Sequence, residues 1–289
     1  MSLKELEKER KVSQKQTIVL IFLFFLFFYV GIHLFVAFVL VNPTVAIIAL
    51  VVIILACGIC ALHFKNIASG FENKVKKELM PLVLQYTISD DGDISWHIEE
   101  NSKIEFTQTF PIFGEYFLPQ ENFSGTYKSV DFLLSEYFVE GGSGKYKDLI
   151  MRGNIIKIPT NIDYLGFAVF GKKKIIASQK WEECIFAGLS ALNLPSVLSN
   201  NRKVYASDAT NIDKLLSPEF IEFVNNLPIK YTLAFFKKDL HIIYSADRDT
   251  FKMGSLWKKI DDPKQYEKFA GDLMEALSIV EKSGSITNF

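Results

Sequence analysis

Two long stretches without a single charged residue constrain this chain more than any other feature of its sequence. Residues 17–41 and 45–62 contain no Asp, Glu, Lys or Arg. As α-helices they are about 37 Å and about 27 Å long, against a bilayer hydrocarbon core of about 30 Å. Both stretches are therefore predicted to cross a membrane.

The two stretches are predicted to form one transmembrane hairpin, 17–62. The first is too long for the apolar core of a secretory signal peptide, which covers about 7–15 residues, and no small-residue cleavage site follows it. Only Asn42, Pro43 and Thr44 separate the stretches. Asn42 suits the N-cap of the second helix, and Pro43 suits its first turn, where a missing N–H costs nothing.

Positive charge flanks the hairpin on one side only. The basic tail of residues 1–16 and the segment 63–87 both carry several Lys or Arg residues, whereas the connecting turn has none. By the positive-inside rule, both termini and the large domain are expected in the cytoplasm. The lipid bilayer is thus the first expected partner of this multi-pass protein.

Residues 63–87 are predicted to form a juxtamembrane helix that continues the second span. Apolar residues recur every four positions along it. This stripe is open to lipid, to the following domain or to another subunit, and packing on the domain is favoured. Pro81 is expected to bend or end the helix. The stripe consists of Ile67, Phe71, Val75, Leu79 and Val83.

Residues 88–289 are predicted to form an α+β domain with a mainly antiparallel sheet. Runs rich in β-branched and aromatic residues cluster early and helical patterns come later, which favours α+β over a doubly wound parallel sheet. A hairpin near Gly171 is expected from residues 165–171 and 173–178. Further strands are expected at 94–100, 103–110, 125–140, 149–159, 229–236 and 240–246.

Three helix starts in the domain are marked by capping residues. Asp208 suits the cap of a short helix through Leu216, and Ser217 with Pro218 opens another through Leu227. Asp262 is expected to cap the C-terminal helix, which is amphipathic with one continuous apolar face.

Charge and cysteine content exclude several classes of protein. From residue 88 onward acidic residues outnumber basic ones, and the absence of a basic stripe argues against nucleic-acid binding. Cys57 and Cys60 have the spacing of a redox or metal pair, but they lie in an apolar helix without a second ligand pair. They are better read as small residues that ease helix contact. Cys184 is a lone thiol, expected to be buried or inert.

The stretch VEGGSGKY, residues 139–146, raises the question of a phosphate-binding loop. A P-loop needs GxxxxGK[ST] between a strand and a helix. Here Val139 stands where the first glycine is required, Tyr146 replaces the hydroxyl residue, and the following residues read as a strand. We therefore expect a Gly-rich strand connection, with Gly144 and Lys145 kept as a weak phosphate-loop candidate.

No catalytic, cofactor-binding or metal-binding residues are identified. The four histidines have no metal-ligand spacing, and there is no GxSxG nucleophile elbow. His33 lies inside the first apolar stretch, where an ionisable residue suggests a role in transport by an oligomer. A neutral imidazole bonded across the hairpin is the favoured alternative.

Two blocks, residues 121–136 and 202–224, resemble the best-marked segments of a bacterial family, domain-of-unknown-function family three-one-three-seven. The resemblance implies two membrane helices, a juxtamembrane helix and a cytoplasmic domain in a bacterial inner membrane, and it implies no activity. Residues 209–213 depart from the family pattern, which often carries Gln-Val-Glu-Ala-Arg there. Asp208 is read first as a helix cap and second as a site residue. The candidate interaction or structural motif comprises Glu121, Gly125, Tyr127, Glu136, Tyr205, Asp208 and Pro218.

The sequence favours a non-enzymatic interaction or scaffold module whose partner is a membrane-associated protein or a second copy of the chain. Fixed membrane placement and the lack of an assembled acid, base and nucleophile support this interpretation. The alternative is a membrane-tethered ligand-sensing or enzymatic domain that binds a phosphate-containing ligand near Lys145.

Overall fold

The computed structural model describes most of the chain, in two compact units. Unit 1 contains Met1–Val83 and Met253–Lys268, and unit 2 contains Leu84–Lys252 and Phe269–Phe289. The described residues are 2–88, 91–97, 117–141, 148–162, 164, 166–171, 189–192, 198, 202–208, 211–228, 230–236, 238–246 and 248–287.

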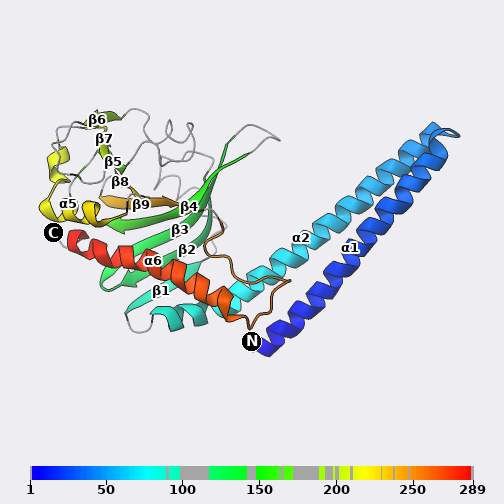
Figure 1. Cartoon of the computed structure of the whole chain (residues 1–289), viewed down its shortest axis with the longest axis horizontal. Helices are drawn as coiled ribbons and strands as arrows, with labels where there is room; N and C mark the ends of the chain where they lie inside the picture. The colour runs from blue at the N-terminus through cyan, green and yellow to red at the C-terminus, as the bar shows by residue number, and fades with distance from the viewer. Residues whose placement is uncertain are drawn as a thin grey trace. The chain divides into compact units, whose positions relative to one another are not determined.

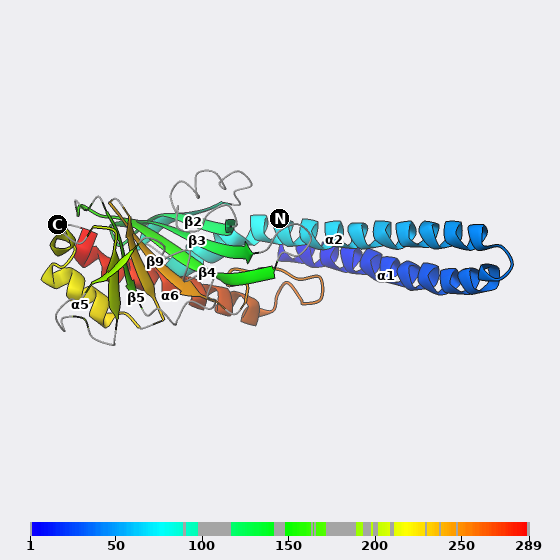
Figure 2. The same cartoon turned by 90° about the horizontal axis from the view of Figure 1, so that it is seen from above.

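Unit 1 is built on two long helices, α1 (Leu3–Val39) and α2 (Pro43–Ile88), which run side by side as a hairpin (Figures 1 and 2). Asn42 caps α2 as predicted, because its Oδ1 accepts a hydrogen bond from the backbone N of Val45 at 3.3 Å. Both helices are long and apolar enough to cross a membrane, and only 6% and 11% of their most apolar windows are buried. A core helix of a soluble protein would be mostly buried.

Small residues lie between the two helices. A Cβ atom added to Gly31 would lie 2.3 Å from Ile53 Cδ1, so the helices approach closely at this point. The Sγ of Cys57 lies 4.0 Å from the carbonyl oxygen of Phe24 on the other helix. This contact is consistent with the interpretation of Cys57 as a small packing residue.

α2 includes the predicted juxtamembrane helix as a continuation of the second span, and α1 also includes the basic tail. α1 begins at Leu3 with a capping box formed by Ser2 and Glu5, so the basic tail is helical rather than a separate segment. α2 continues through Pro81 to Ile88 and does not end at the proline. Leu79 and Met80 are both buried immediately before Pro81, and such packing outweighs one lost backbone hydrogen bond.

The described residues of unit 2 form a nine-stranded sheet in the order β1-β2-β3-β4-β9-β8-β5-β7-β6, and each of its neighbouring pairs is antiparallel. The predicted α+β class is confirmed. The strands are β1 (Gly92–His97), β2 (Phe117–Tyr127), β3 (Val130–Gly141), β4 (Asp148–Pro159), β5 (Phe167–Gly171), β6 (Ser190–Leu192), β7 (Lys203–Ala206), β8 (Thr232–Phe236) and β9 (Asp239–Ser245).

Two strand predictions were wrong in detail. The single strand expected at 125–140 is divided between β2 and β3 by a tight turn at Lys128 and Ser129, whose φ angles are 46° and 65°. The hairpin expected near Gly171 does not form with β5, because both edges of β5 are already paired, with β7 and β8. Its second predicted strand, like residues 103–110, lies outside the described residues.

Helices α5 (Pro218–Asn226) and α6 (Pro263–Thr287) begin where the capping residues predicted. Ser217 Oγ accepts from the backbone N of Phe220 at 3.2 Å, and Asp262 Oδ1 accepts from the backbone N of Lys264 at 3.1 Å. From Phe269 onward, α6 covers one face of the sheet (Figure 1). Its buried apolar face contains Phe269, Leu273, Ala276, Leu277 and Val280.

The cap predicted at Asp208 was wrong. The expected helix through Leu216 is only a 3-10 turn, Ile212–Lys214, and Asn211 occupies its N-cap position. The side chain of Asp208 instead accepts a hydrogen bond from Asn211 Nδ2 at 2.9 Å. Asp208 thus orders the turn through another side chain rather than by capping the helix itself.

Candidate functional site

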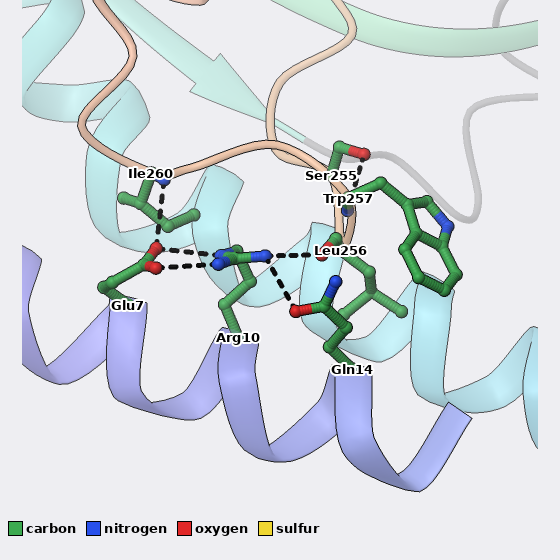
Figure 3. A network of polar contacts seen from close by, with 7 residues as sticks. All are labelled: Glu7, Arg10, Gln14, Ser255, Leu256, Trp257 and Ile260. Carbon is green, nitrogen blue, oxygen red and sulfur yellow. Dashed lines mark hydrogen bonds and ion pairs between the residues drawn. The ribbon is translucent and has the colours of Figure 1, made fainter. Parts of the chain in front are cut away.

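The most extensive polar network of unit 1 joins α1 to the segment Met253–Lys268, which we call the strap (Figure 3). Its centre is Arg10, of which only 6% is exposed. The Arg10 guanidinium donates to both carboxylate oxygens of Glu7, at 2.8 and 2.7 Å, and to the carbonyl oxygen of Leu256 at 2.8 Å. Glu7 Oε2 also accepts from the backbone N of Ile260 at 3.2 Å. The ion pair thus binds the strap at two backbone positions, Leu256 and Ile260.

Apolar packing surrounds this network. Leu6 on α1 and three strap residues are almost completely buried. On α2, the predicted stripe contributes Val75, and a Cβ atom added to Gly254 of the strap would lie 2.9 Å from it. Gly254 has a φ of +82°, in the region that favours glycine. The buried strap residues are Met253, Leu256 and Ile260.

Glu7 and Arg10 shift each other's pKa, so that both side chains stay charged. The Arg10 guanidinium lowers the pKa of Glu7 to about 2, against the opposing effect of partial burial, and Glu7 in turn raises the pKa of Arg10. Folding is therefore linked to ionised Glu7, and this contribution is lost only as the pH falls through the range between 4.5 and about 2. No sequence pattern indicated the strap, because Glu7 and Arg10 resemble an ordinary surface pair on one helix.

Unit 2 contains a second polar arrangement on the sheet face that α6 covers. Glu136 on β3 is paired with Asn154 on β4, which is paired with Tyr244 on β9. Glu121 lies beside them on β2, at an irregularity in the register. We call these four residues the polar row. It combines two of the predicted motif residues, Glu121 and Glu136, and places them on the sheet face that the amphipathic helix α6 covers.

Glu136 is the most perturbed carboxyl group of the row. It is 2% exposed, and its Oε1 accepts from the backbone N of Thr250 at 2.7 Å. Its pKa is raised to about 7, and burial is the largest cause. The nearby Asp249 and Glu121 also raise this pKa, whereas the backbone hydrogen bond from Thr250 lowers it. Glu121 accepts from Trp96 Nε1 at 2.7 Å. Glu136 can therefore gain or lose a proton near neutral pH.

A small polar cavity of about 140 Å³ adjoins the row. Asn154 is fully buried in its wall and donates from Nδ2 to Thr250 Oγ1 at 3.0 Å, and its Oδ1 has no partner among the described residues. Two ion pairs line the rim, Lys230 with Glu275 and Arg248 with Asp272. The cavity can hold water or a very small polar molecule. Its lining comprises Asn154, Lys230, Tyr244, Ser245, Ala246, Arg248, Thr250, Asp272 and Glu275.

The other predicted motif residues are not gathered at one site. Tyr127 is buried at the end of β2, and Tyr205 is paired with Val169 on β5, away from the polar row in the strand order. Asp208 follows β7, and its backbone oxygen accepts from the hydroxyl of Tyr164 at 3.2 Å. Pro218 is the first residue of α5. Gly144 and Lys145 lie outside the described residues.

The ring of His33 does not bond across the hairpin as expected. Its Nδ1 lies 3.0 Å from the carbonyl oxygen of Tyr29, one turn earlier on the same helix. Within the described ranges, no three His, Cys, Asp or Glu residues are grouped so that they could hold a metal ion.

Arg202, at the start of the second block, has a structural role that sequence reasoning missed. It is buried, and its guanidinium donates to the carbonyl oxygens of Tyr231, Leu227 and Pro228 at 2.7–2.8 Å. The end of α5 leaves backbone carbonyls without helical partners, and Arg202 satisfies them. The block therefore links β7 to the C-terminal end of α5.

Gly125 is explained by backbone geometry. Its φ is +151°, and an added Cβ atom would lie 1.9 Å from the carbonyl oxygen of Asp93 on β1. We expect Gly125→Ala to lower the free energy of unfolding by about 1–3 kcal/mol, measured by urea denaturation. Gly271→Ala is the matched control, because no atom lies within 4 Å of its added Cβ and it is helical, so a gain of about 0.5–1 kcal/mol is expected. Equal effects of the two variants would contradict this explanation.

One family model matches part of the chain. Residues 198–283 match the model of a family described as protein of unknown function (DUF3137). The match confirms the family that the sequence motifs indicated, and it covers Arg202, Tyr205, Asp208, Pro218 and most of α6.

Other comparisons are distant. No curated protein matches the sequence significantly. Among solved structures, the crystal structure of the mycobacterial trehalose monomycolate transport factor A, TtfA, is similar with a TM-score of 0.35 and 8% sequence identity. The similarity covers 71% of this chain and 96% of that one.

Proposed function

We propose that the protein is a two-helix anchor of the bacterial inner membrane that presents an α+β interaction module to the cytoplasm. The module binds a membrane-associated protein or a second copy of the chain. The distribution of Lys and Arg around the hairpin supports the cytoplasmic placement of both termini.

The strap is the observation that carries this proposal. Unit 1 contains the two apolar helices together with a segment that lies between β9 and the body of α6 in sequence. If unit 2 were only tethered to the two helices, a single covalent connection at the end of α2 would be enough. Here a buried ion pair and several buried apolar side chains fix a second part of the chain to the helices. The chain therefore joins the two units after Val83 and again on both sides of the strap, and several such links suit a module that must meet a partner at the membrane.

In-cell photo-crosslinking of the full-length protein tests the proposal. A photoreactive amino acid at Tyr86 or Met274, two exposed apolar positions of unit 2, is expected to give one or two discrete protein adducts. The same residue at Leu40, which is exposed near the helix connection, is the matched control and should give none of these adducts.

The adducts should persist when Lys145 and Asp208 are each replaced by Ala, because an interaction surface does not depend on a ligand site there. Discrete adducts at Leu40 but at neither position of unit 2 would contradict the proposal. Loss of the adducts in Lys145→Ala would favour the ligand-sensing alternative instead.

A further inference from the structure

The strap presents one large side chain outward. Trp257 is 54% exposed, although Leu256 before it is buried and Ile260 after it is buried. The two residues that follow it, Lys258 and Lys259, are also exposed. Unit 1 therefore folds without burying the indole, and it presents an aromatic ring and two cations together at its surface.

The contact between the strap and α1 shows how far Trp257 lies from the apolar stretch of α1. The carbonyl oxygen of Leu256 is bound by Arg10, seven residues before Thr17, where the uncharged stretch begins. Seven helical residues span about 10 Å. In Figure 3, Ile260 lies at the Glu7 end of the network and Trp257 lies toward the Gln14 end, which is nearer to the apolar stretch. The headgroup layer on each side of a bilayer is about 5–8 Å thick, so the indole is at or near its depth.

The chemistry of the three residues fits that layer. Tryptophan concentrates at membrane–water interfaces, because its ring is apolar and its N–H still needs a hydrogen-bond acceptor. Lysine side chains near the cytoplasmic leaflet are attracted to anionic headgroups. α1 adds two exposed cations on the same side of the apolar stretch, Lys11 and Lys15.

We propose that Trp257, Lys258 and Lys259 form a third membrane contact, in which the indole enters the headgroup layer and the lysines bind anionic phospholipid headgroups. This contact rests on the proposed membrane anchoring and deepens it. The strap is then held between α1 and the bilayer surface, and its attachment to the helices depends on lipid composition.

Tryptophan fluorescence of the full-length protein in lipid nanodiscs tests the contact. Lipids brominated near the headgroup end of their acyl chains quench only indoles at that depth. The component removed by Trp257→Phe is expected to fall about twofold or more in discs rich in phosphatidylglycerol. The fluorescence that remains in Trp257→Phe comes from Trp96 and Trp181, and it is measured in the same discs as the reference.

A matched pair of charge variants separates headgroup binding from general attraction. The double variant Lys258→Gln, Lys259→Gln should reduce the quenching of Trp257 in anionic discs. Lys264→Gln, Lys268→Gln removes the same charge from exposed positions of the same strap and should leave the quenching unchanged. Equal effects of the two double variants would overturn the role of the lysines.

The other outcomes distinguish this contact from membrane anchoring itself. If the protein enters the discs but Trp257 is not quenched by brominated lipid in anionic or neutral discs, the contact is overturned and the anchor stands. A protein adduct at position 257 in cells, together with an unquenched indole, would assign the surface to a protein partner and also overturn it. If the protein does not enter the discs at all, the proposed function fails.

Discussion

Glu136→Gln is expected to raise the free energy of unfolding by about 3 kcal/mol near pH 8 and to change it little near pH 4. The pKa of Glu136 is raised from 4.5 to about 7, with burial as the largest cause. Above about pH 7 the carboxyl is ionised in both states, and the folded state bears the cost of a buried charge. Below 4.5 it is protonated in both states and the cost disappears. Between these values, stability therefore rises as the pH falls.

The glutamine variant isolates the charge. Its side-chain oxygen can still accept from the backbone N of Thr250, so the hydrogen bond to the loop is retained. Urea unfolding of the detergent-solubilised protein at about pH 4 and about pH 8, followed by circular dichroism, measures the difference. Glu222→Gln, at an exposed position on α5, is the control and should show no such dependence on pH. A Glu136→Gln variant that is less stable than the native protein at pH 8 would contradict the expectation.

A carboxyl group that titrates near neutral pH is costly to keep in a packed domain, and Glu136 is not isolated. Through Thr250 it is linked to Asn154, whose amide lies in the wall of a polar cavity. Perturbed carboxyl groups beside cavities are frequent at functional sites, although structural networks also perturb them. The predicted pH dependence would show that ionised Glu136 destabilises the folded domain. The polar row would then be the first candidate binding site for a ligand of unit 2.

Local signals allowed much of the fold to be predicted. The starts of α2, α5 and α6 follow from Asn42, Ser217 and Asp262, because an N-cap acts on residues within one turn of itself. The β8–β9 hairpin was equally clear. The turn at Lys128 and Ser129 was missed because left-handed turn positions normally carry Asn, Asp or Gly, and neither residue gives that signal.

The sites depend on contacts that no local signal carries. Glu121 and Glu136 came from separate ends of one block, and only the register of β2 against β3, with its irregularity between Pro119 and Asn122, brings them together. Arg10 and Leu256 are 246 residues apart in sequence. The Glu7–Arg10 pair looks like a surface pair on α1, and it is buried because the strap covers it. Neither the composition nor the periodicity of the sequence indicates that the strap packs there.

Arg10→Ala is expected to release the strap, with a loss of about 3–5 kcal/mol from the interaction of the strap with α1. The side chains of Arg10 and Glu7 are 8% and 22% exposed, so removing the guanidinium leaves a partly buried carboxylate without its counter-charge. The carbonyl oxygen of Leu256 loses its donor at the same time. Arg10→Lys should give a smaller loss, because an ammonium keeps the charge but cannot form the paired contacts with Glu7.

Hydrogen exchange on the full-length protein in nanodiscs measures this release segment by segment. Amides of residues 253–262 should exchange much faster in Arg10→Ala, while amides of β8 and β9 keep their protection, because those strands lie in unit 2. Lys74→Ala is the matched control: its ion pair with Glu9 joins α2 to α1 in the same unit, but both side chains are more than 40% exposed. An exposed pair contributes about 0–1 kcal/mol, so the strap should stay protected in that variant. Unchanged exchange at residues 253–262 in Arg10→Ala would mean that apolar packing alone holds the strap. It would contradict the conclusion that the Glu7–Arg10 pair fixes the strap to α1.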